Sequence, residues 1–494
     1  MRSRRAFLGG LSAAFASPPV AAATRDQRPV DVPWSGPATP LLAAPNAELI
    51  LLRRVTNGIT QDDLNMIAAY GYNGYLEYQL NAPAVEDSAC DARLASYPTL
   101  SVPTPELYAL DSGMVQTQLI ESTILRAIYS RRQLLERMVE FWTDHFNTDI
   151  NTVGILKTAD VRDVLRANAL GTFPQMLVAQ AKSPAMINRL NNQQNSRLSP
   201  NQNYAREVME LHTMGVTGGY TQQDIVEVAR CFTGWRYVTT TNDPNRGNFV
   251  FNTSTNVRDV GSKLVLGNTI PGVAGAAGIN DGLTVLRILG DHPSTHRFLA
   301  TKLLRWFISY DPSEAQIAEI AEVIRQTGGD IKAVLRRVLS YGYITWAPPL
   351  YKRPFHYIVS GLRAMNANMT RYDTLRYTWL SGMWQVPFNW NPPNGYPHSM
   401  EYWGTLVLPR WNFAFSLGVP GNVGGATIDM TALLAGANTG QRVADRLDFL
   451  LMGGQMRPAD KAALIAHLSP DPPTTTRIRD AFGLALASPG FQWY

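Results

Sequence analysis

Three polar side chains share one face of a predicted helix that begins near Pro200 or Asn201. Asn203, Glu207 and Glu210 are spaced i, i+4 and i+7, which aligns them along an α-helix. Two carboxylates in different surroundings can separate their pKa values and serve as acid and base, as in polysaccharide cleavage. The spacing therefore predicts Glu207 and Glu210 as a catalytic pair, with Asn203 as a substrate contact.

A second polar cluster, Asp144 and His145, closes a long apolar helical stripe. His145 is the best single candidate for a metal ligand or a base. We expect Asp144 or His145 to approach the two glutamates in the fold. Such a site would bind a divalent metal through Asp144, His145 and Glu207, or perform acid–base catalysis through His145, Glu207 and Glu210.

A structural alternative stays open for the two glutamates. Arginine–carboxylate pairs commonly lock the helices of large helical proteins together, and a buried pair need do no chemistry. In that case Glu207 and Glu210 would accept hydrogen bonds from buried arginines. The candidate donors are Arg206, Arg236, Arg353 and Arg410.

The segment 379–412 breaks the helical pattern and is rich in tryptophan, proline and asparagine. Aromatic faces beside amides bind sugars, so we take Trp390, Trp403 and Arg410 as candidate substrate contacts. The alternative is that the rings pack a long irregular segment onto the protein and hydrogen-bond its backbone through their N–H groups.

Helical patterns dominate the rest of the chain and must position these side chains. The longest helical signal covers residues 113–147, where apolar residues recur every three, four or seven positions. Strand-like alternation is confined to about 237–266, which predicts a small β-hairpin inserted in a mainly α body with long irregular loops. Further helices are predicted at 158–168, 174–181, 201–214, 221–235, 280–290, 295–309, 313–327, 330–341, 352–367, 442–453, 457–467 and 474–487.

The composition is that of a globular protein, since 45% of the 494 residues are hydrophobic and 17% are charged. No run approaches the roughly 18 consecutive apolar residues that span a bilayer, so we expect no integral membrane segment. Arg2, Arg4 and Arg5 account for most of the net charge of +5, and the rest of the chain carries +2. This near-neutral remainder predicts no nucleic-acid partner.

The N-terminal residues have the order of a twin-arginine signal peptide. Arg4 and Arg5 precede a modestly apolar run, and small residues follow up to Ala23. We expect residues 1–23 to be cleaved and residues 24–45 to form a Pro-rich extended arm. The protein is therefore predicted to be periplasmic or secreted, exported by the twin-arginine pathway.

Cys90 and Cys231 are the only cysteines. Without a Cys-x-x-Cys motif, the sequence excludes a thioredoxin-like site, a zinc ribbon, a c-type haem attachment and a four-cysteine iron–sulfur cluster. An oxidising compartment would permit one disulfide if the fold brings the two Cα atoms within about 7 Å of each other. The sequence leaves this pairing open.

The segment PNQNYAREVMELHTMGVTGGYTQQDIVEVARCFTGW, residues 200–235, closely resembles the signature of the bacterial family known as domain of unknown function 1800. The resemblance covers roughly residues 45–490 and implies one helical domain over 46–494. It also implies an exported protein, often encoded beside a second uncharacterised family, domain of unknown function 1501, and implies no activity. Supporting matches are LLRRVTNGIT at 51–60, FWTDHFNT at 141–148, HPSTHRFLATKLLRWF at 292–307 and YKRPFHYIVSGLRAM at 351–365.

One position departs from the family pattern. Members usually carry a His-Asp pair before the Lys-x-Val-Leu-Gly segment, whereas this chain has Arg258-Asp259. If that histidine is a ligand or a base in relatives, the loop around Arg258 has altered chemistry here. The departure weakens any site proposed in this loop.

Two functions follow as alternatives. The first is a periplasmic, hydrolase-like enzyme acting on a glycan or another cell-envelope substrate through a carboxylate/histidine site, with or without a divalent metal. The second is a non-catalytic binding or assembly partner of the co-encoded exported protein, in which the signature residues serve packing. The sequence does not decide whether the protein is an enzyme.

Overall fold

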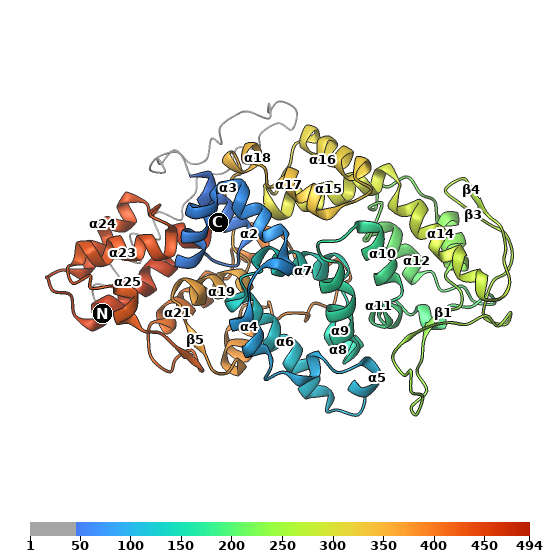
Figure 1. The fold of residues 1–494 in the computed structure, drawn as a ribbon, viewed down its shortest axis with the longest axis horizontal. Helices are drawn as coiled ribbons and strands as arrows, with labels where there is room; N and C mark the ends of the chain where they lie inside the picture. The colour runs from blue at the N-terminus through green and yellow to red at the C-terminus, as the bar shows by residue number, and fades with distance from the viewer. Residues whose placement is uncertain (1–45) are drawn as a thin grey trace.

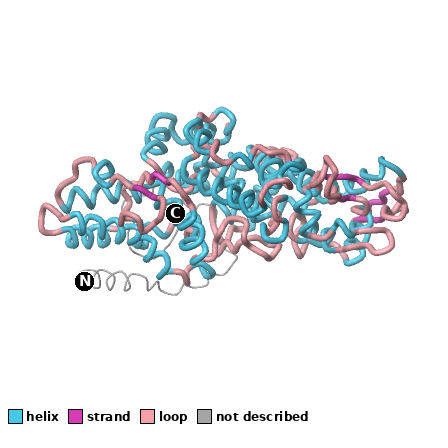
Figure 2. Tube along the Cα trace, turned by 90° about the horizontal axis from the view of Figure 1, so that it is seen from below, coloured by secondary structure: helices cyan, strands magenta, loops and turns pink. Residues whose placement is uncertain are grey.

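The computed structural model describes residues 46–494 (Figure 1). The predicted signal peptide and Pro-rich arm, residues 1–45, lie outside the described residues. The prediction of a mainly α fold is confirmed, because helices form most of the described chain and strands form only small two-stranded sheets (Figure 2). Within residues 46–494, no helix combines the length and the apolar character needed to cross a membrane.

The central part of the elongated molecule is built from the first helices of the described chain (Figure 1). Capping fixes the start of α3, where Thr60 and Asp63 form a reciprocal capping box. The central helices are α2 (Ala47–Val55), α3 (Gln61–Leu80), α4 (Ser88–Leu94), α5 (Thr104–Leu107), α6 (Ser112–Tyr129), α7 (Gln133–His145), α8 (Ile150–Val153) and α9 (Leu156–Ala159), followed by the π-helical turn η3 (Asp160–Arg166).

One end of the molecule in Figure 1 carries α14 and the β-strands β1, β3 and β4, and the opposite end carries α23, α24 and α25. The helices that lead to the first end and return from it are α10 (Phe173–Ala181), α11 (Pro184–Arg189), α12 (Asn203–Glu210), α13 (Gln222–Cys231), α14 (Ile279–Gly290), α15 (Pro293–Phe307), α16 (Glu314–Gln326), α17 (Ile331–Val338) and α18 (Tyr341–Thr345). The remaining helices are α19 (Pro354–Ala364), the π-helical η6 (Leu375–Leu380), α20 (Met400–Trp403), α21 (Val407–Leu417), α22 (Met430–Leu434), α23 (Gly440–Met452), α24 (Pro458–Leu468), α25 (Thr475–Ala487) and α26 (Pro489–Gln492). Short 3-10 turns are η1 (Ala82–Ala84), η2 (Pro98–Leu100), η4 (Asn192–Gln194) and η5 (Gly275–Gly278).

A single cluster of buried apolar side chains extends along the chain from Ala47 to Phe491. It includes Trp142 of α7 and Phe413 of α21, both of which are buried. Close helix packing depends on small residues, since a Cβ atom at Gly483 would lie 2.5 Å from the ring of Phe415. The N- and C-terminal helices therefore share one core.

The longest predicted helix, 113–147, is wrong, because the chain breaks between α6 and α7. Ser130 ends α6 in an extended conformation, and its hydroxyl donates to Asp87 Oδ2 at 2.6 Å. The side-chain amide of Gln133 donates to the carbonyls of Ala127 and Ser130, at 3.2 and 2.7 Å. These side chains satisfy the backbone groups that a helix end exposes. The apolar pattern continues across residues 130–132, so the sequence gives no sign that α6 ends there.

The predicted small β-hairpin insertion is confirmed, and the region around 237–266 contains two separate hairpins rather than one. Leu266 and Gly267 adopt positive φ angles of 47° and 76°, the geometry of a two-residue turn, so 263–265 pairs with the residues that follow it. The antiparallel pairs are β1 (Trp235–Tyr237) with β2 (Phe249–Phe251), β3 (Lys263–Val265) with β4 (Asn268–Ile270), and β5 (Asn368–Met369) with β6 (Ala426–Thr427).

The segment 379–412 is less irregular than predicted. It contains the short helix α20 and the first turns of α21. Its first part has backbone bends at Trp384 and Phe388, where φ is 61° and 66°. The chain after these bends contacts α7 through Gly395 and α15 through His398, whose ring centroid lies 5.1 Å from that of Trp306.

Arg258, which stands where family members usually have histidine, is part of a buried ion cluster. Its guanidinium forms an ion pair with Asp281 and donates to Thr233 Oγ1 at 3.0 Å and to the carbonyl of Gly278 at 2.9 Å. Lys263 Nζ lies 2.7 Å from the same Asp281 carboxylate. All three side chains are buried, so the cluster fastens α14 to β3 and to the end of α13.

The two cysteines do not form a disulfide. Cys90 of α4 and Cys231 of α13 are both free and buried. Burial raises the pKa of each thiol to about 12, which suppresses the thiolate that disulfide exchange requires. The question that the sequence leaves open is thereby answered for the described fold.

We predict that Asp281→Asn destabilises the protein strongly. The variant leaves buried Arg258 without a carboxylate and leaves Lys263 only the more distant Asp259, at 3.9 Å. Breaking a buried ion pair in this way costs about 3–5 kcal/mol. Urea unfolding measures the loss. The matched control is Asp291→Asn, which breaks the Arg287–Asp291 pair of 3.8 Å whose side chains are 69% and 67% exposed, and which should change the free energy of unfolding by less than about 0.5 kcal/mol. Equal, small losses in both variants would contradict the structural role of the cluster.

Candidate functional site

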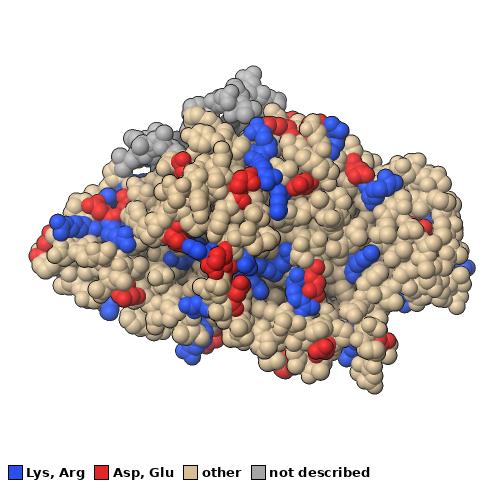
Figure 3. All heavy atoms as spheres, in the orientation of Figure 1, with Lys and Arg blue, Asp and Glu red and all other residues tan. Residues whose placement is uncertain are grey.

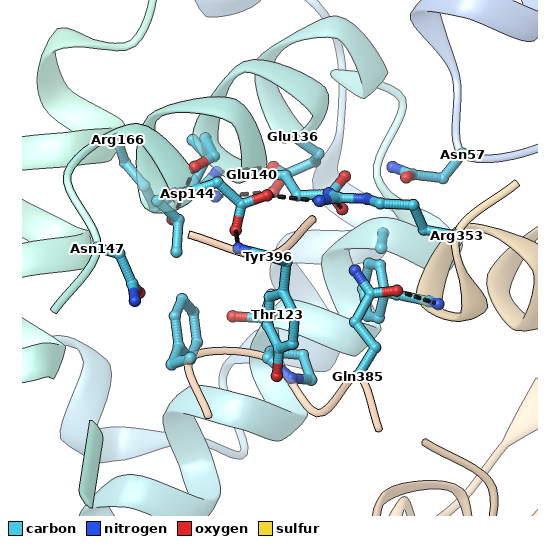
Figure 4. A pocket seen from close by; sticks show the side chains of 16 residues that line it. Asn57, Thr123, Glu136, Glu140, Asp144, Asn147, Arg166, Arg353, Gln385 and Tyr396 are labelled. Carbon is cyan, nitrogen blue, oxygen red and sulfur yellow. Dashed lines mark hydrogen bonds and ion pairs between the residues drawn. The ribbon is translucent and has the colours of Figure 1, made fainter. Parts of the chain in front are cut away.

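A pocket lined by charged, amide and apolar side chains opens beside α7 (Figure 4). It has a volume of about 660 Å³, including the part open to solvent. Figure 3 shows acidic and basic side chains gathered side by side around the middle of this face. The lining residues are Asn57, Thr123, Ala127, Glu136, Val139, Glu140, Thr143, Asp144, Asn147, Arg166, Arg353, Phe355, Gln385, Pro387, Phe388 and Tyr396.

Helix α7 supplies three carboxylates to this pocket. Glu136, Glu140 and Asp144 are spaced i, i+4 and i+8, so they follow one another along one side of the helix. Trp142 lies on another side of α7 and is fully buried, where its Nε1 donates to the carbonyl of Ala169 at 3.0 Å. Burial of the Trp142 side therefore turns the acidic side toward the pocket.

Two arginines from other elements meet these carboxylates (Figure 4). Arg166 at the end of η3 makes two hydrogen bonds of 2.7 Å to Glu136, the bidentate geometry that guanidinium favours. Arg353 donates to Asp144 Oδ2 at 2.6 Å and forms an ion pair with Glu140. One guanidinium thus joins two carboxylates from successive turns of α7.

Local chain geometry fixes Arg353. It is the N-cap residue of α19 and has extended backbone angles, φ −63° and ψ 157°, because Pro354 at the first helical position restricts the residue before it. Its guanidinium lies 4.5 Å from the ring centroid of Trp306. The first turn of α19 is capped by Gln385, whose Oε1 accepts from the Phe355 N–H at 2.9 Å.

The pKa values of Asp144 and Glu136 are shifted in opposite directions. Burial raises the pKa of Asp144 above 3.8, and although the Arg353 charge opposes this, nearby Glu140 adds to it. Burial also acts on Glu136, but the charge and hydrogen bonds of Arg166 outweigh it and lower the Glu136 pKa. Of these two groups, Asp144 is therefore the one biased toward the protonated form that a general acid needs.

The segment 385–396 closes the pocket over the end of α7. The Tyr396 N–H donates to Asp144 Oδ1 at 3.4 Å, and the Tyr396 hydroxyl donates to the carbonyl of Val386 at 2.7 Å. Gly395 has a φ of 76°, and a Cβ atom there would lie 2.2 Å from the Asp144 carbonyl oxygen. Only glycine permits this approach of the loop to α7.

The predicted base His145 lies outside the pocket lining. It is buried among aromatic rings, with the centroid of Phe146 at 4.4 Å and that of Trp142 at 5.4 Å. Its Nε2 is 3.0 Å from the carbonyl oxygen of His212. Burial holds the pKa of His145 well below 6.5, and the charges of Lys302 and His212 add to this effect. The neutral ring is therefore part of the core.

The predicted pair on α12 is a separate feature. Asn203 is exposed at the start of this helix, and Glu207 and Glu210 are half-buried. Burial and the nearby Glu210 raise the pKa of Glu207. Glu210 Oε1 accepts from Arg206 Nη1 at 3.3 Å within the same helix, and the Arg206 side chain is 40% exposed, so this pair is not a buried lock between helices. None of these residues lines the α7 pocket.

The predicted metal ligands are not assembled. Among residues 46–494, no group of three or more His, Cys, Asp or Glu side chains is arranged to hold a metal ion. Asp144 faces Arg353, and His145 faces the His212 carbonyl. The set Asp144, His145 and Glu207 therefore does not form a shared coordination site.

The predicted substrate contacts in segment 379–412 mostly hold the fold together. Trp403 is buried, and its Nε1 donates to the Pro397 carbonyl at 2.7 Å. Arg410 is fully buried and donates to Gln492 Oε1 at 3.1 Å and to the Lys352 carbonyl at 2.6 Å. Their burial contradicts a substrate-binding role in this conformation.

Trp390 has a supporting position next to the pocket. Its ring is half-buried and lies 4.9 Å from the ring centroid of Tyr396. Its carbonyl accepts from Asn147 Nδ2 at 2.7 Å. The ring thus packs the loop that closes over α7, which agrees with the packing alternative for the tryptophans.

Comparison with known proteins identifies the family. The family model described as "Protein of unknown function (DUF1800)" matches residues 50–493. The chain belongs to the DUF1800 family. No curated protein and no solved structure matches it. The resemblance carried by residues 200–235 is thereby confirmed, and membership assigns no reaction.

In this DUF1800 chain, most of the pocket residues lie outside the clusters that the sequence predicts as a site. Glu136 and Glu140 stand four and eight residues before Asp144, a spacing that marks one helix side and was available from the sequence. Arg166 carries no comparable signal. Arg353 was considered only as a partner for the glutamates of α12, and its contact with Asp144 joins residues 209 positions apart.

We predict that in the His145→Phe variant the free energy of unfolding falls less as the pH is lowered than it does in wild type. The folded pKa of His145 is depressed, so its contribution to stability is present above pH 6.5 and is lost as the pH falls, because only the unfolded chain then binds the proton. The variant should lose stability less steeply between pH 6.5 and 5, by up to about 1.4 kcal/mol per pH unit. Chemical unfolding of both proteins across this range measures the slopes. Parallel curves would show that the native ring titrates normally.

Proposed function

We propose that this DUF1800 protein is an exported, hydrolase-like enzyme that cleaves a glycan of the bacterial cell envelope by acid–base chemistry. The observation that supports this most is the pair Glu140 and Asp144, which meet at one guanidinium in the wall of a solvent-open pocket. Most glycosidases use two carboxyl groups that flank the scissile bond. The proposal moves the catalytic centre from α12 to α7.

The two carboxyl groups have different roles in this proposal. Asp144 is the general acid, because burial favours its protonated form. It donates its proton to the leaving glycosidic oxygen, while Glu140 takes a proton from the attacking water or attacks the sugar carbon itself. Arg353 is a positioning residue that holds both groups and limits how far burial raises the Asp144 pKa.

The remaining lining suits a hydroxylated ring. Asn57 Oδ1 is buried without a hydrogen-bond partner in the described part of the chain, so it offers an acceptor to a sugar hydroxyl. Phe355, Phe388 and Tyr396 add apolar faces to the same pocket. Polar groups beside aromatic faces are typical of sites that bind small polar ligands in a fixed orientation.

Export is part of the proposal. The twin-arginine segment and the small residues up to Ala23 support delivery across the cytoplasmic membrane. A periplasmic or secreted location would bring the pocket to envelope glycans.

A second candidate function is a non-catalytic binding or assembly partner of a co-encoded exported protein of the domain of unknown function 1501 family. The observation that favours it is that Glu136, Glu140 and Asp144 each have a guanidinium partner. Such pairs also occur as purely structural locks. In this case the pocket would bind without turnover, and the protein would co-purify with its partner after native export.

We predict that Asp144→Asn lowers kcat for release of reducing ends from isolated envelope polysaccharide by about 100- to 10,000-fold, because the acid can no longer donate a proton. The control is Glu227→Gln, which replaces a carboxylate that pairs with Arg230 at 2.7 Å outside the pocket and should keep the wild-type rate. Circular dichroism shows whether each variant is folded. Activity of a folded Asp144→Asn protein equal to wild type would contradict the assigned acid, and a wild type that binds without turnover would favour the second candidate.

A further inference from the structure

A second pocket lies on the opposite side of the extended segment that precedes α19. It is bordered by α2, α19 and the last residues of the described chain, and it has a volume of about 370 Å³, including the part open to solvent. Its polar lining side chains include Arg53, Lys352, His356 and Ser360, and its lining contains no aspartate or glutamate. It shares no lining residue with the α7 pocket.

Lys352 is the most unusual group in this pocket. Its side chain is buried, with 6% of the residue exposed. Its Nζ lies 3.1 Å from Ser360 Oγ and 3.6 Å from the ring centroid of Phe491. Burial holds its pKa well below 10.5, and the charges of Arg53 and Arg410 lower it further. Among residues 46–494, no Asp or Glu side chain lines the pocket beside this ammonium.

Arg53 brings a second cation to the same pocket from α2. Its guanidinium donates to the carbonyl of Met452 at 2.7 Å. Burial lowers its pKa to about 10, although the charge of Asp448 opposes this. Asp448 itself is bound to Lys461 at 3.0 Å and to the Met456 N–H at 2.7 Å. Arg53 therefore shares its nearest carboxylate with other donors.

The surrounding buried arginines Arg54 and Arg410 bind backbone and amide oxygens rather than Asp or Glu side chains. Arg54 donates to the backbone oxygens of Tyr494 and Pro348, and Arg410 donates to Gln492 and to the Lys352 carbonyl. Positive charge thus accumulates around the pocket. Placing cations in a low-dielectric interior without anions is costly, and an anion in the pocket would remove that cost.

We infer that this pocket binds a phosphate group, held by Lys352 and Arg53 as cations and by His356 as a hydrogen-bond donor. A phosphate presents several strong acceptor oxygens and up to two negative charges, which matches donors that converge from α2, α19 and the segment before α19. A carboxylate offers two oxygens and one charge, and would leave one of the two cations unpaired. The inference is independent of the chemistry proposed for the α7 pocket.

The test is calorimetric titration of the full protein with inorganic phosphate at fixed ionic strength in chloride. We expect saturable binding of one phosphate per chain, weakened at least tenfold in Lys352→Met and in Arg53→Gln. Without phosphate, Lys352→Met should melt at the same temperature as wild type or higher, because an uncompensated buried cation is gone. An unchanged or higher melting temperature together with weaker phosphate binding would show that the variant has lost the binding site and not the fold.

Lys302→Met is the matched control for the removed lysine. Burial lowers the pKa of Lys302 to about 8, yet this residue lies outside the pocket lining. The phosphate affinity of the Lys302→Met protein should therefore equal that of wild type. Absence of saturable binding by wild type, or equal affinity in Lys352→Met, would overturn the inference.

Two further titrations identify the source of the phosphate group. One uses glycerol 3-phosphate, and the other uses phosphatidylglycerol vesicles with phosphatidylcholine vesicles as the blank. Lys352-dependent binding to the anionic vesicles indicates a lipid headgroup. Binding of the two soluble phosphates without vesicle binding indicates a soluble ligand. Both outcomes support a phosphate site, and failure of all three probes contradicts it.

Discussion

The contact between Arg353 and the carboxylates of Glu140 and Asp144 is the constraint on which the centre of this protein depends. It joins α7 to the start of α19 across 209 residues of sequence. The guanidinium is almost fully buried, so loss of either side would leave an uncompensated charge, at a cost of several kcal/mol. The loop 385–396 then closes over the same helix end through Gly395 and Tyr396. The pocket exists because these three elements meet at one ion pair.

The segment before α19 serves both pockets. Residues 350–352 pair with the last described residues through hydrogen bonds between Leu350 and Tyr494 and between Lys352 and Gln492. Successive side chains of an extended chain point to opposite sides, so Lys352 enters the cation-rich pocket while Arg353 enters the pocket with the carboxylates. Two adjacent cations thus meet two different electrostatic environments. Arg353 meets two carboxylates, whereas the pocket that holds Lys352 has no Asp or Glu side chain in its lining among residues 46–494.

Much of the fold could be predicted from the sequence, because apolar periodicity and capping residues report local structure. The capping box at Thr60 and the acidic pair on α12 are both present in the structure. At Ser130 the helix ends although the apolar pattern continues, so periodicity cannot reveal this break. Periodicity also cannot show which side chains far apart in the sequence meet in the fold. It therefore indicated Asp144 but not its partner Arg353. His145 was misjudged for a related reason, since its residue type permits catalysis while its aromatic surroundings exclude solvent.

The central claim is that the α7 pocket holds a glycan between Asp144 and Glu140. A crystal structure of the Asp144→Asn protein soaked with oligosaccharides from envelope polysaccharide tests it most directly. Our account predicts a sugar ring in the pocket, with a glycosidic oxygen within hydrogen-bond distance of residue 144 and the ring carbon facing Glu140. An empty α7 pocket with an oligosaccharide bound on the acidic face of α12 would contradict it.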